Sequence, residues 1–225
     1  FVRIEPTLQV EGAERLFAVG DCASLPGMQK AGVYAVRSGP ILADNLRRAL
    51  TGQPLRRYVQ AAGESGASPI LGTGMTAGAE MAALVNGTFG HALDFDDVLS
   101  MMPAHPSAVI VAAVLASLDG RPVSGHALVE AYALGVEVGG KIGVGITNEH
   151  YQRGFHATGT LALFSALAAL AKLHGLDAAT ARQAFGIAGS MASGLRRNFG
   201  TMTKPLHTGL AARSALTAFR LAASG

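Results

Sequence analysis

The spacing of apolar residues changes near residue 60 of the chain. Beyond that point Ala, Leu and Val recur at helical spacing in six stretches: residues 76–91, 106–118, 124–142, 156–174, 177–193 and 204–224. The fourth stretch is apolar on nearly every face, so we expect it at the centre of a bundle. Abundant Ala and Gly favour short distances between packed helices. The pattern predicts a mainly α protein in which residues 71–225 form an all-α helical bundle.

Residues at the ends of these stretches support the assignment. Pro106 is tolerated in the first turn of a helix, and Ser124 and Asp177 are typical residues for the position just before one. Gly175 follows the most apolar stretch and predicts its end. Strand signals are poor after Leu71.

The N-terminal part of the chain has a different pattern. Residues 16–19 predict a short buried strand, and residues 31–50 predict a helix that Pro40 kinks or splits. Residues 1–60 are therefore expected to form a small α/β strand-helix segment. Small and polar residues over 61–70 indicate a linker between this segment and the bundle.

Composition narrows the class of protein. Only 15% of residues are charged and the net charge is +3, without a basic stripe that carries aromatics, so we expect a globular protein that does not bind nucleic acid. The longest apolar run, residues 157–171, is shorter than the roughly 18–20 residues of a membrane span, so we expect no membrane partner. A single cysteine, Cys22, excludes an internal disulfide and fits a reducing, cytoplasmic location.

Three carboxylates follow the first predicted helix of the bundle. Asp94, Asp96 and Asp97 lie close enough to repel one another, so at least one needs a cationic or hydrogen-bonding partner. Asp94 is either a catalytic carboxylate that orients a histidine or part of a cluster that caps the next helix. Asp96 and Asp97 are expected to be structural.

Further polar residues stand at the expected starts of helices. His105 precedes Pro106 and is placed as a general base or as a surface residue. His156 opens the most apolar helix, where it either faces a cavity or packs in the core. Lys204 opposes the dipole of the last helix, which favours an anionic partner such as a substrate carboxylate. His207, one turn further on, is expected to be structural.

These residues belong to a series of motifs. They are NG at 86–87, HALDFDD at 91–97, HPS at 105–107, GFH at 154–156 and TKPLH at 203–207. From near Leu71 to the last residue, the series resembles the MmgE/PrpD family, which includes 2-methylcitrate dehydratases and cis-aconitate decarboxylases.

The resemblance implies a lyase that eliminates or isomerises a small di- or tricarboxylate without a cofactor. It assigns catalytic positions to Asp94, His105 and His156, and a substrate-binding position to Lys204. A base such as His105 and the charge of Lys204 would lower the barrier to removing a proton next to a carboxylate. Val98 stands where some decarboxylases of the family have threonine, which counts against that specificity.

The resemblance has two further implications. Members of the family are roughly twice as long and close a second, α/β lid domain over the substrate, so we expect this chain to hold the core half of a site with weak or no activity alone. Apolar surface left without the lid favours association, and we expect a homodimer. Neither an H-E-x-x-H nor a D-D-x-x-D motif occurs, so no metal is expected.

Two other interpretations stay open. Residues 17–23 and 30–37 resemble the C-terminal end of the flavin domain in pyridine-nucleotide-disulfide oxidoreductases, and Asp21 matches a residue that meets the flavin's ribityl-phosphate region. The chain lacks the G-x-G-x-x-G motif after a strand, so the resemblance implies a remnant without bound FAD. The alternatives to a lyase are therefore a fragment of an FAD-dependent oxidoreductase or a non-catalytic helical module that dimerises.

Overall fold

The computed structural model of the chain describes residues 2–18, 23–24, 48 and 66–225. The chain divides into two compact units, Phe1–Ser65 and Gly66–Gly225, and the division falls within the predicted linker. Asp21, Cys22 and nearly all of the helix predicted over 31–50 lie outside the described residues.

The first unit contains short strands. Strand β1 (Val2–Arg3) pairs in parallel with β4 (Ala23–Ser24), and β2 (Gln9–Val10) pairs antiparallel with β3 (Ala13–Phe17). The expectation of a buried strand at Leu16 was wrong, because this side chain is 62% exposed. Among the described strands β3 pairs with β2 alone, and a two-stranded ribbon leaves much of its surface open to solvent.

The second unit is helical, which confirms the prediction of a mainly α fold. It opens with a small antiparallel pair, β5 (Ser68–Pro69) and β6 (Thr76–Ala77). The helices that follow are α3 (Ala79–Gly90), α4 (Pro106–Ser117), α5 (Gly125–Ile146), α6 (Glu149–Gln152), α7 (Ala157–Thr160), α8 (Ala162–His174), α9 (Ala178–Gly189), the 3₁₀ turn η2 (Arg196–Asn198) and α10 (Thr203–Ala223).

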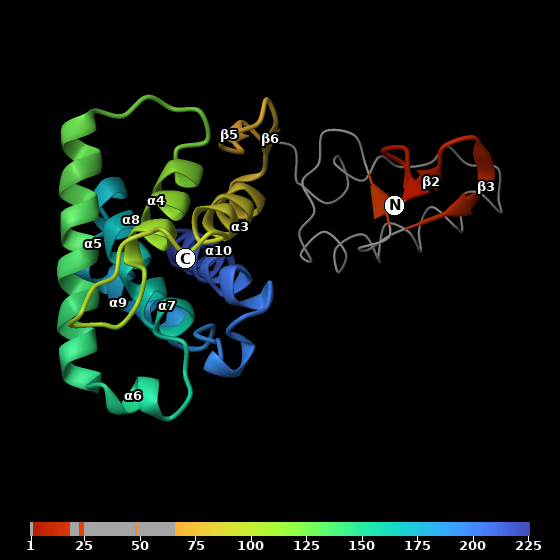
Figure 1. Ribbon diagram of the computed structural model, residues 1–225. Helices are drawn as coiled ribbons and strands as arrows, with labels where there is room; N and C mark the ends of the chain where they lie inside the picture. Colours follow the sequence, from red (N-terminus) through yellow and green to blue (C-terminus); the bar gives the residue numbers. More distant parts are fainter. Residues whose placement is uncertain (1, 19–22, 25–47, 49–65) are drawn as a thin grey trace. The chain divides into compact units, whose positions relative to one another are not determined.

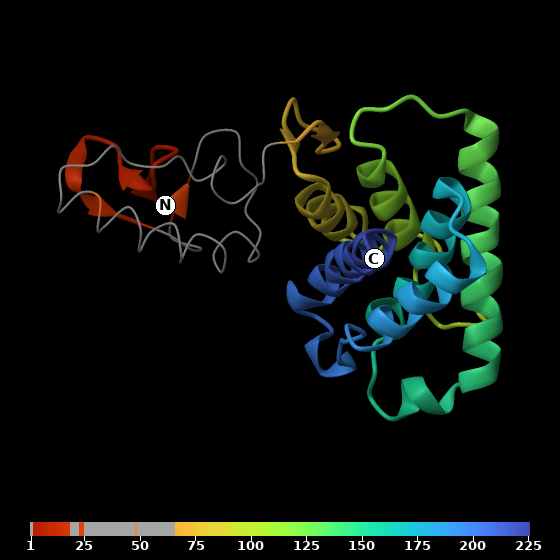
Figure 2. The ribbon, with the colours of Figure 1, turned by 180° about the vertical axis from the view of Figure 1, so that it is seen from behind.

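Helices α8 and α10 form the centre of this bundle. Helix α8 packs against α4, α5, α9 and α10, and α10 also packs against α3. Figures 1 and 2 show the long helix α5 along one side of the bundle, next to α8. Leucines 163, 167, 170 and 216 on the two central helices are fully buried. The most apolar stretch of the sequence therefore lies where its pattern predicts.

Glycines allow two of the helix pairs to approach closely. A Cβ on Gly209 of α10 would overlap the carbonyl oxygen of Leu84 in α3. A Cβ on Gly135 of α5 would lie 2.6 Å from the carbonyl oxygen of Ser165 in α8. Both approaches are too close for a real carbon atom, so these crossings require glycine.

The predicted helix ends are largely observed. The Ser124 hydroxyl accepts a hydrogen bond from the Ala127 amide, the Asp177 carboxylate accepts one from the Thr180 amide, and Gly175 ends α8 with φ +67°. Helix α5 runs four residues beyond the predicted end at 142, to Ile146. Its glycines do not end it, because Gly143 is buried against the loop before α4 and permits close packing there.

The central helical run ends at His174, as predicted, and is longer than the apolar run at 157–171. The helical run Ala157–His174 has 18 residues and a mean hydropathy of 1.3, so by length and composition it meets the lower limit for a membrane span. Lys172 and His174 lengthen it beyond the apolar run at 157–171. However, 72% of this run is buried inside the bundle, as is typical of a helix in a protein core.

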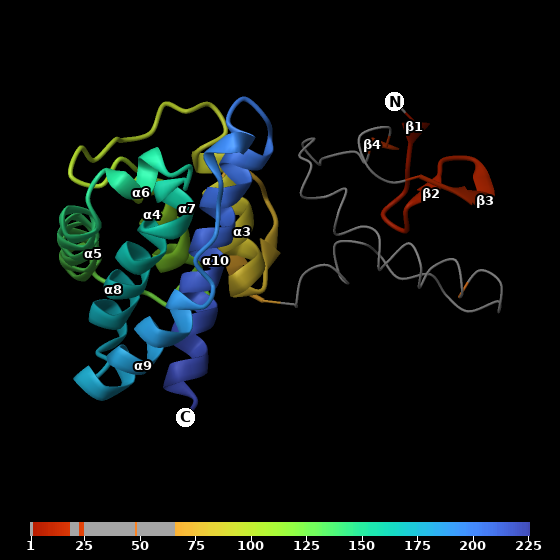
Figure 3. The same cartoon turned by 90° about the horizontal axis from the view of Figure 1, so that it is seen from below.

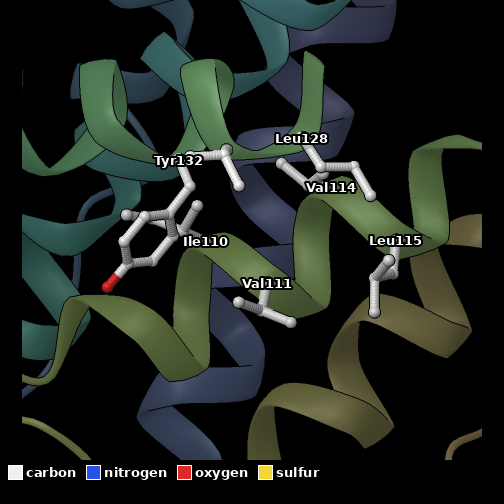
Figure 4. A pocket seen from close by; sticks show the side chains of 7 residues that line it. Ile110, Val111, Val114, Leu115, Leu128 and Tyr132 are labelled. Carbon is white, nitrogen blue, oxygen red and sulfur yellow. The ribbon is translucent and has the colours of Figure 1, made fainter. Parts of the chain in front are cut away.

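An apolar pocket of about 210 Å³ lies between α4 and α5 (Figure 4). Ile110, Val114 and Leu128 are among its lining residues, and the Tyr132 hydroxyl is the polar group beside it. That hydroxyl is already hydrogen-bonded to the Ser107 hydroxyl at 2.6 Å. The pocket thus offers apolar contact and no free acid or base.

Candidate active site

Segments that are distant in sequence meet at one end of the bundle. Figure 3 shows the loop between α3 and α4 at the same end as α6, α7 and the start of α10. The backbone amide of His105 in this loop donates to the Thr158 hydroxyl in α7, at 3.1 Å. Lys204, in the first turn of α10, donates from Nζ to Asp94 Oδ1 at 2.5 Å. Three of the four predicted site residues are therefore in or beside this loop.

Asp94 and Lys204 form an ion pair at the edge of this cluster. Asp94 has φ +59°, in the left-handed region, and its side chain is 56% exposed, whereas that of Lys204 is 15% exposed. The hydrogen bond from the ammonium lowers the pKa of the Asp94 carboxyl. The anionic partner expected for Lys204 is thus, in this structure, a carboxylate of the protein itself.

His91 is a site residue that the sequence analysis did not single out. It follows the last residue of α3, its side chain is fully buried, and its Nδ1 lies 2.9 Å from both oxygens of Asp96. Burial lowers the pKa of His91 below its ordinary value, although Asp96 opposes the effect. Among the described residues Nε2 of His91 has no hydrogen-bond partner. Asp96, expected to be structural, therefore holds an imidazole whose other nitrogen is unpaired.

His105 lies between the two carboxylates. Its Nε2 is 3.6 Å from Asp94 Oδ1, and its Nδ1 is 3.6 Å from Asp96 Oδ2. The ring centroids of His105 and His91 are 4.4 Å apart. Asp94 thus lies beside a histidine, as expected, but Asp96 makes the shorter contact to an imidazole.

His156 is a buried neighbour of His91. Their ring centroids are 6.2 Å apart, and Nδ1 of His156 is 3.0 Å from Nδ1 of His207. Both residues are buried, with 2% and 6% exposed. Burial and the neighbouring His207 lower the pKa of His156 to about 3, so this imidazole is neutral at pH 7. His207, predicted to be structural, is its direct partner.

Asp97 has a different role from its two neighbours. Its carboxylate accepts a hydrogen bond from the backbone amide of Ser107, in the first turn of α4, at 3.1 Å. This contact caps the helix and balances its dipole. Capping of the next helix was one of the two roles considered for the carboxylate cluster.

The cluster also has the composition of a metal site. Ligand atoms of His91, Asp94, Asp96 and His105 lie within 4.8 Å of one another. The Lys204 ammonium, however, already pairs with Asp94 and would repel a divalent cation. The donor set therefore fits an ion-pair network better than a metal centre.

Comparison with known proteins assigns the chain to a family. The profile of the MmgE/PrpD N-terminal domain matches residues 47–225. The chain belongs to the MmgE/PrpD family. The match begins before Leu71, so the family's domain extends further towards the N-terminus than the motifs indicate.

Relatives of known activity match the same region. The chain is 36% identical over 151 residues to the cis-aconitate decarboxylase of Homo sapiens, covering 64% of this chain and 31% of the relative. It is 32% identical over 179 residues to the cis-aconitate decarboxylase of Aspergillus terreus, covering 75% of this chain and 36% of the relative. The chain thus spans about a third of the length of these MmgE/PrpD enzymes. The flavoprotein resemblance of residues 1–60 finds no support among them.

Proposed function

We propose that residues 66–225 carry the acid–base half of a lyase site for a small di- or tricarboxylate. The observation that supports this proposal is the grouping of His91, His105, Asp94, Asp96 and Lys204 at one end of the bundle. Two carboxylates oppose one ammonium there. Imidazoles, carboxylates and an ammonium within reach of one another are the groups that acid–base chemistry next to a carboxylate requires.

His105 is the candidate base. It is partly accessible, unlike His91, and two carboxylates lie 3.6 Å from its nitrogens. Removal of a proton from the carbon next to a carboxylate places negative charge on that carboxylate. The Lys204 ammonium is the cation in the cluster that can stabilise this charge. To do so, it must either give up its hydrogen bond to Asp94 or bond to Asp94 and the substrate carboxylate at the same time.

The finer specificity is also a proposal. The relatives are named cis-aconitate decarboxylases, which makes cis-aconitate the first compound to test. Val98 is 66% exposed on the same loop, in the position where some decarboxylases have threonine. Dehydration of 2-methylcitrate is therefore the second reaction to test, with both products followed by NMR.

We further propose that the chain forms a homodimer. The loop between α3 and α4 exposes Leu93, Phe95, Val98 and Met101, and Phe95 is 89% exposed. Large apolar side chains exposed on one loop favour association. Sedimentation of the wild type and of Phe95→Ser over a range of protein concentrations tests this proposal. The dimer of the variant should dissociate at a higher protein concentration than that of the wild type. Equal dissociation would show that this loop is not part of a dimer interface.

Calorimetric titration tests the carboxylate site itself. The wild type should bind cis-aconitate or 2-methylcitrate more tightly than acetate, because a tricarboxylate can contact the Lys204 ammonium and an imidazole N–H together. Lys204→Met should abolish the preference. Lys141→Met is the matched control, because Lys141 pairs with Glu137 on the exposed face of α5. Equal binding by both variants, or no binding by the wild type, would overturn the proposal.

A further inference from the structure

The buried pair His156 and His207 defines a proton arrangement, because two neutral imidazoles bonded through Nδ1 cannot both donate. One Nδ1 carries the proton and the other accepts it at 3.0 Å. The choice fixes which nitrogen of His156 carries its own proton. His156 therefore offers its remaining nitrogen, Nε2, either as a donor or as an acceptor.

Asn198 determines which of the two histidines donates the hydrogen bond between them. Its side-chain amide nitrogen, Nδ2, lies 3.5 Å from Nε2 of His207. An amide NH₂ only donates, so Nε2 of His207 is the acceptor and Nδ1 of His207 carries the proton. His207 then donates from Nδ1 to Nδ1 of His156, and the proton of His156 is on Nε2.

The surrounding packing holds both rings in place. Gly194 has φ +136°, and a Cβ there would lie 3.4 Å from the His207 ring. The edge of Phe199 packs on His156, with ring centroids 4.8 Å apart and planes at 81°. The His156 amide donates to the Gly194 carbonyl, which joins the same loop to the start of α7. Both rings are therefore in close contact with the segment from Gly194 to Phe199.

We propose that Asn198 and His207 are positioning residues that hold His156 as a neutral donor from Nε2 towards the candidate site. The inference rests on the proposed function for its last step, the hydrogen bond from His156 to a bound carboxylate. The proton order itself, from Asn198 through His207 to His156, does not depend on any substrate. Neutrality at pH 7 agrees with the lowered pKa of His156, since a buried imidazole without a carboxylate partner resists protonation.

The position of His156 gives this order a consequence. The ring lies between His207, at 5.2 Å between centroids, and His91, at 6.2 Å. Nδ1 is occupied by His207, so Nε2 is the nitrogen left to meet a ligand. A neutral N–H donor stabilises negative charge that develops on a substrate oxygen without first having to bind a proton. His156 would thus act as a donor, and His105 would exchange the proton.

Long-range ¹⁵N–¹H NMR of the ligand-free protein, labelled at histidine, tests the proton order. The wild type should show His207 protonated on Nδ1 and His156 on Nε2. In Asn198→Asp a carboxylate that only accepts replaces the amide, so the order should reverse, with His207 protonated on Nε2 and His156 on Nδ1. Asn148→Asp, an exposed change beside α6, should leave both tautomers unchanged.

The outcomes separate this inference from the proposed function. His156 protonated on Nδ1 in the wild type, or no reversal in Asn198→Asp, would overturn the proton order even if cis-aconitate binds. The expected tautomers together with no carboxylate binding would refute the proposed function and leave the order standing. If cis-aconitate shifts the His105 resonances but not Nε2 of His156, the donor role is wrong.

Discussion

Burial of His156 should make the folded protein lose stability in mild acid. The pKa of this imidazole falls from 6.5 to about 3 on folding, because burial and the neighbouring His207 disfavour its charge. Below pH 6.5 the unfolded chain binds a proton at this residue and the folded chain does not. The stabilisation from neutral His156 is therefore complete above pH 6.5 and is lost progressively as the pH falls towards 3.

The magnitude follows from the difference in proton binding. Each pH unit below 6.5 costs about 1.4 kcal/mol while the folded imidazole stays neutral. Between about pH 7.5 and about pH 5.0 the free energy of unfolding should fall by at most about 2 kcal/mol through His156 alone. This is a large share of the roughly 5–15 kcal/mol that stabilises an ordinary domain.

Urea unfolding at the two pH values, followed by circular dichroism, measures the effect. His156→Asn should be less stable than the wild type at about pH 7.5, because it removes the contact to His207, but its stability should fall by about 2 kcal/mol less on acidification. His126→Asn is the control, because His126 is exposed on α5 next to Glu130. An unchanged pH dependence in His156→Asn, or an equal change in His126→Asn, would refute the reasoning.

Three further changes test the packing and the site. Gly209→Ala should lower the free energy of unfolding, measured with heat or urea, by about 1–3 kcal/mol, because the added Cβ would overlap α3. Gly186→Ala is the control: there is open space around Gly186, so this change should be neutral or slightly stabilising. Asp97→Ala should cost about 1 kcal/mol in the same assay, because α4 loses its cap. Asp94→Asn frees Lys204, so cis-aconitate should bind about fivefold more tightly by calorimetry, and weaker binding would contradict a direct role for this lysine.

The helices of the bundle were readable from local sequence. Ser124, Asp177 and Gly175 act through atoms within four residues of themselves, so their roles need no knowledge of the fold. The end of α5 was not readable in this way. Its glycines look like helix breakers in the sequence, and only their close contacts with neighbouring segments explain why the helix continues.

The sequence predicted most residues of the site, but it did not predict which of them form ion pairs and hydrogen bonds with one another. Asp94 and Lys204 are 110 residues apart, and no local pattern indicates that one neutralises the other. His91 was missed because it ends an apolar helix, where a lone histidine is ordinary, although it stands three residues before Asp94 in the same motif. Its hydrogen bond to Asp96 depends on the turn after α3, which carries the positive φ of Asp94.

Histidine NMR during titration with cis-aconitate tests the central claim most directly. If the cluster is a carboxylate site, the ring resonances of His91, His105 and His156 should shift together and saturate. Those of His126, exposed on α5, and of His174, bonded to Ser117 between α4 and α8, should stay unchanged. Shifts confined to His126 and His174, or no shifts at all, would contradict the account.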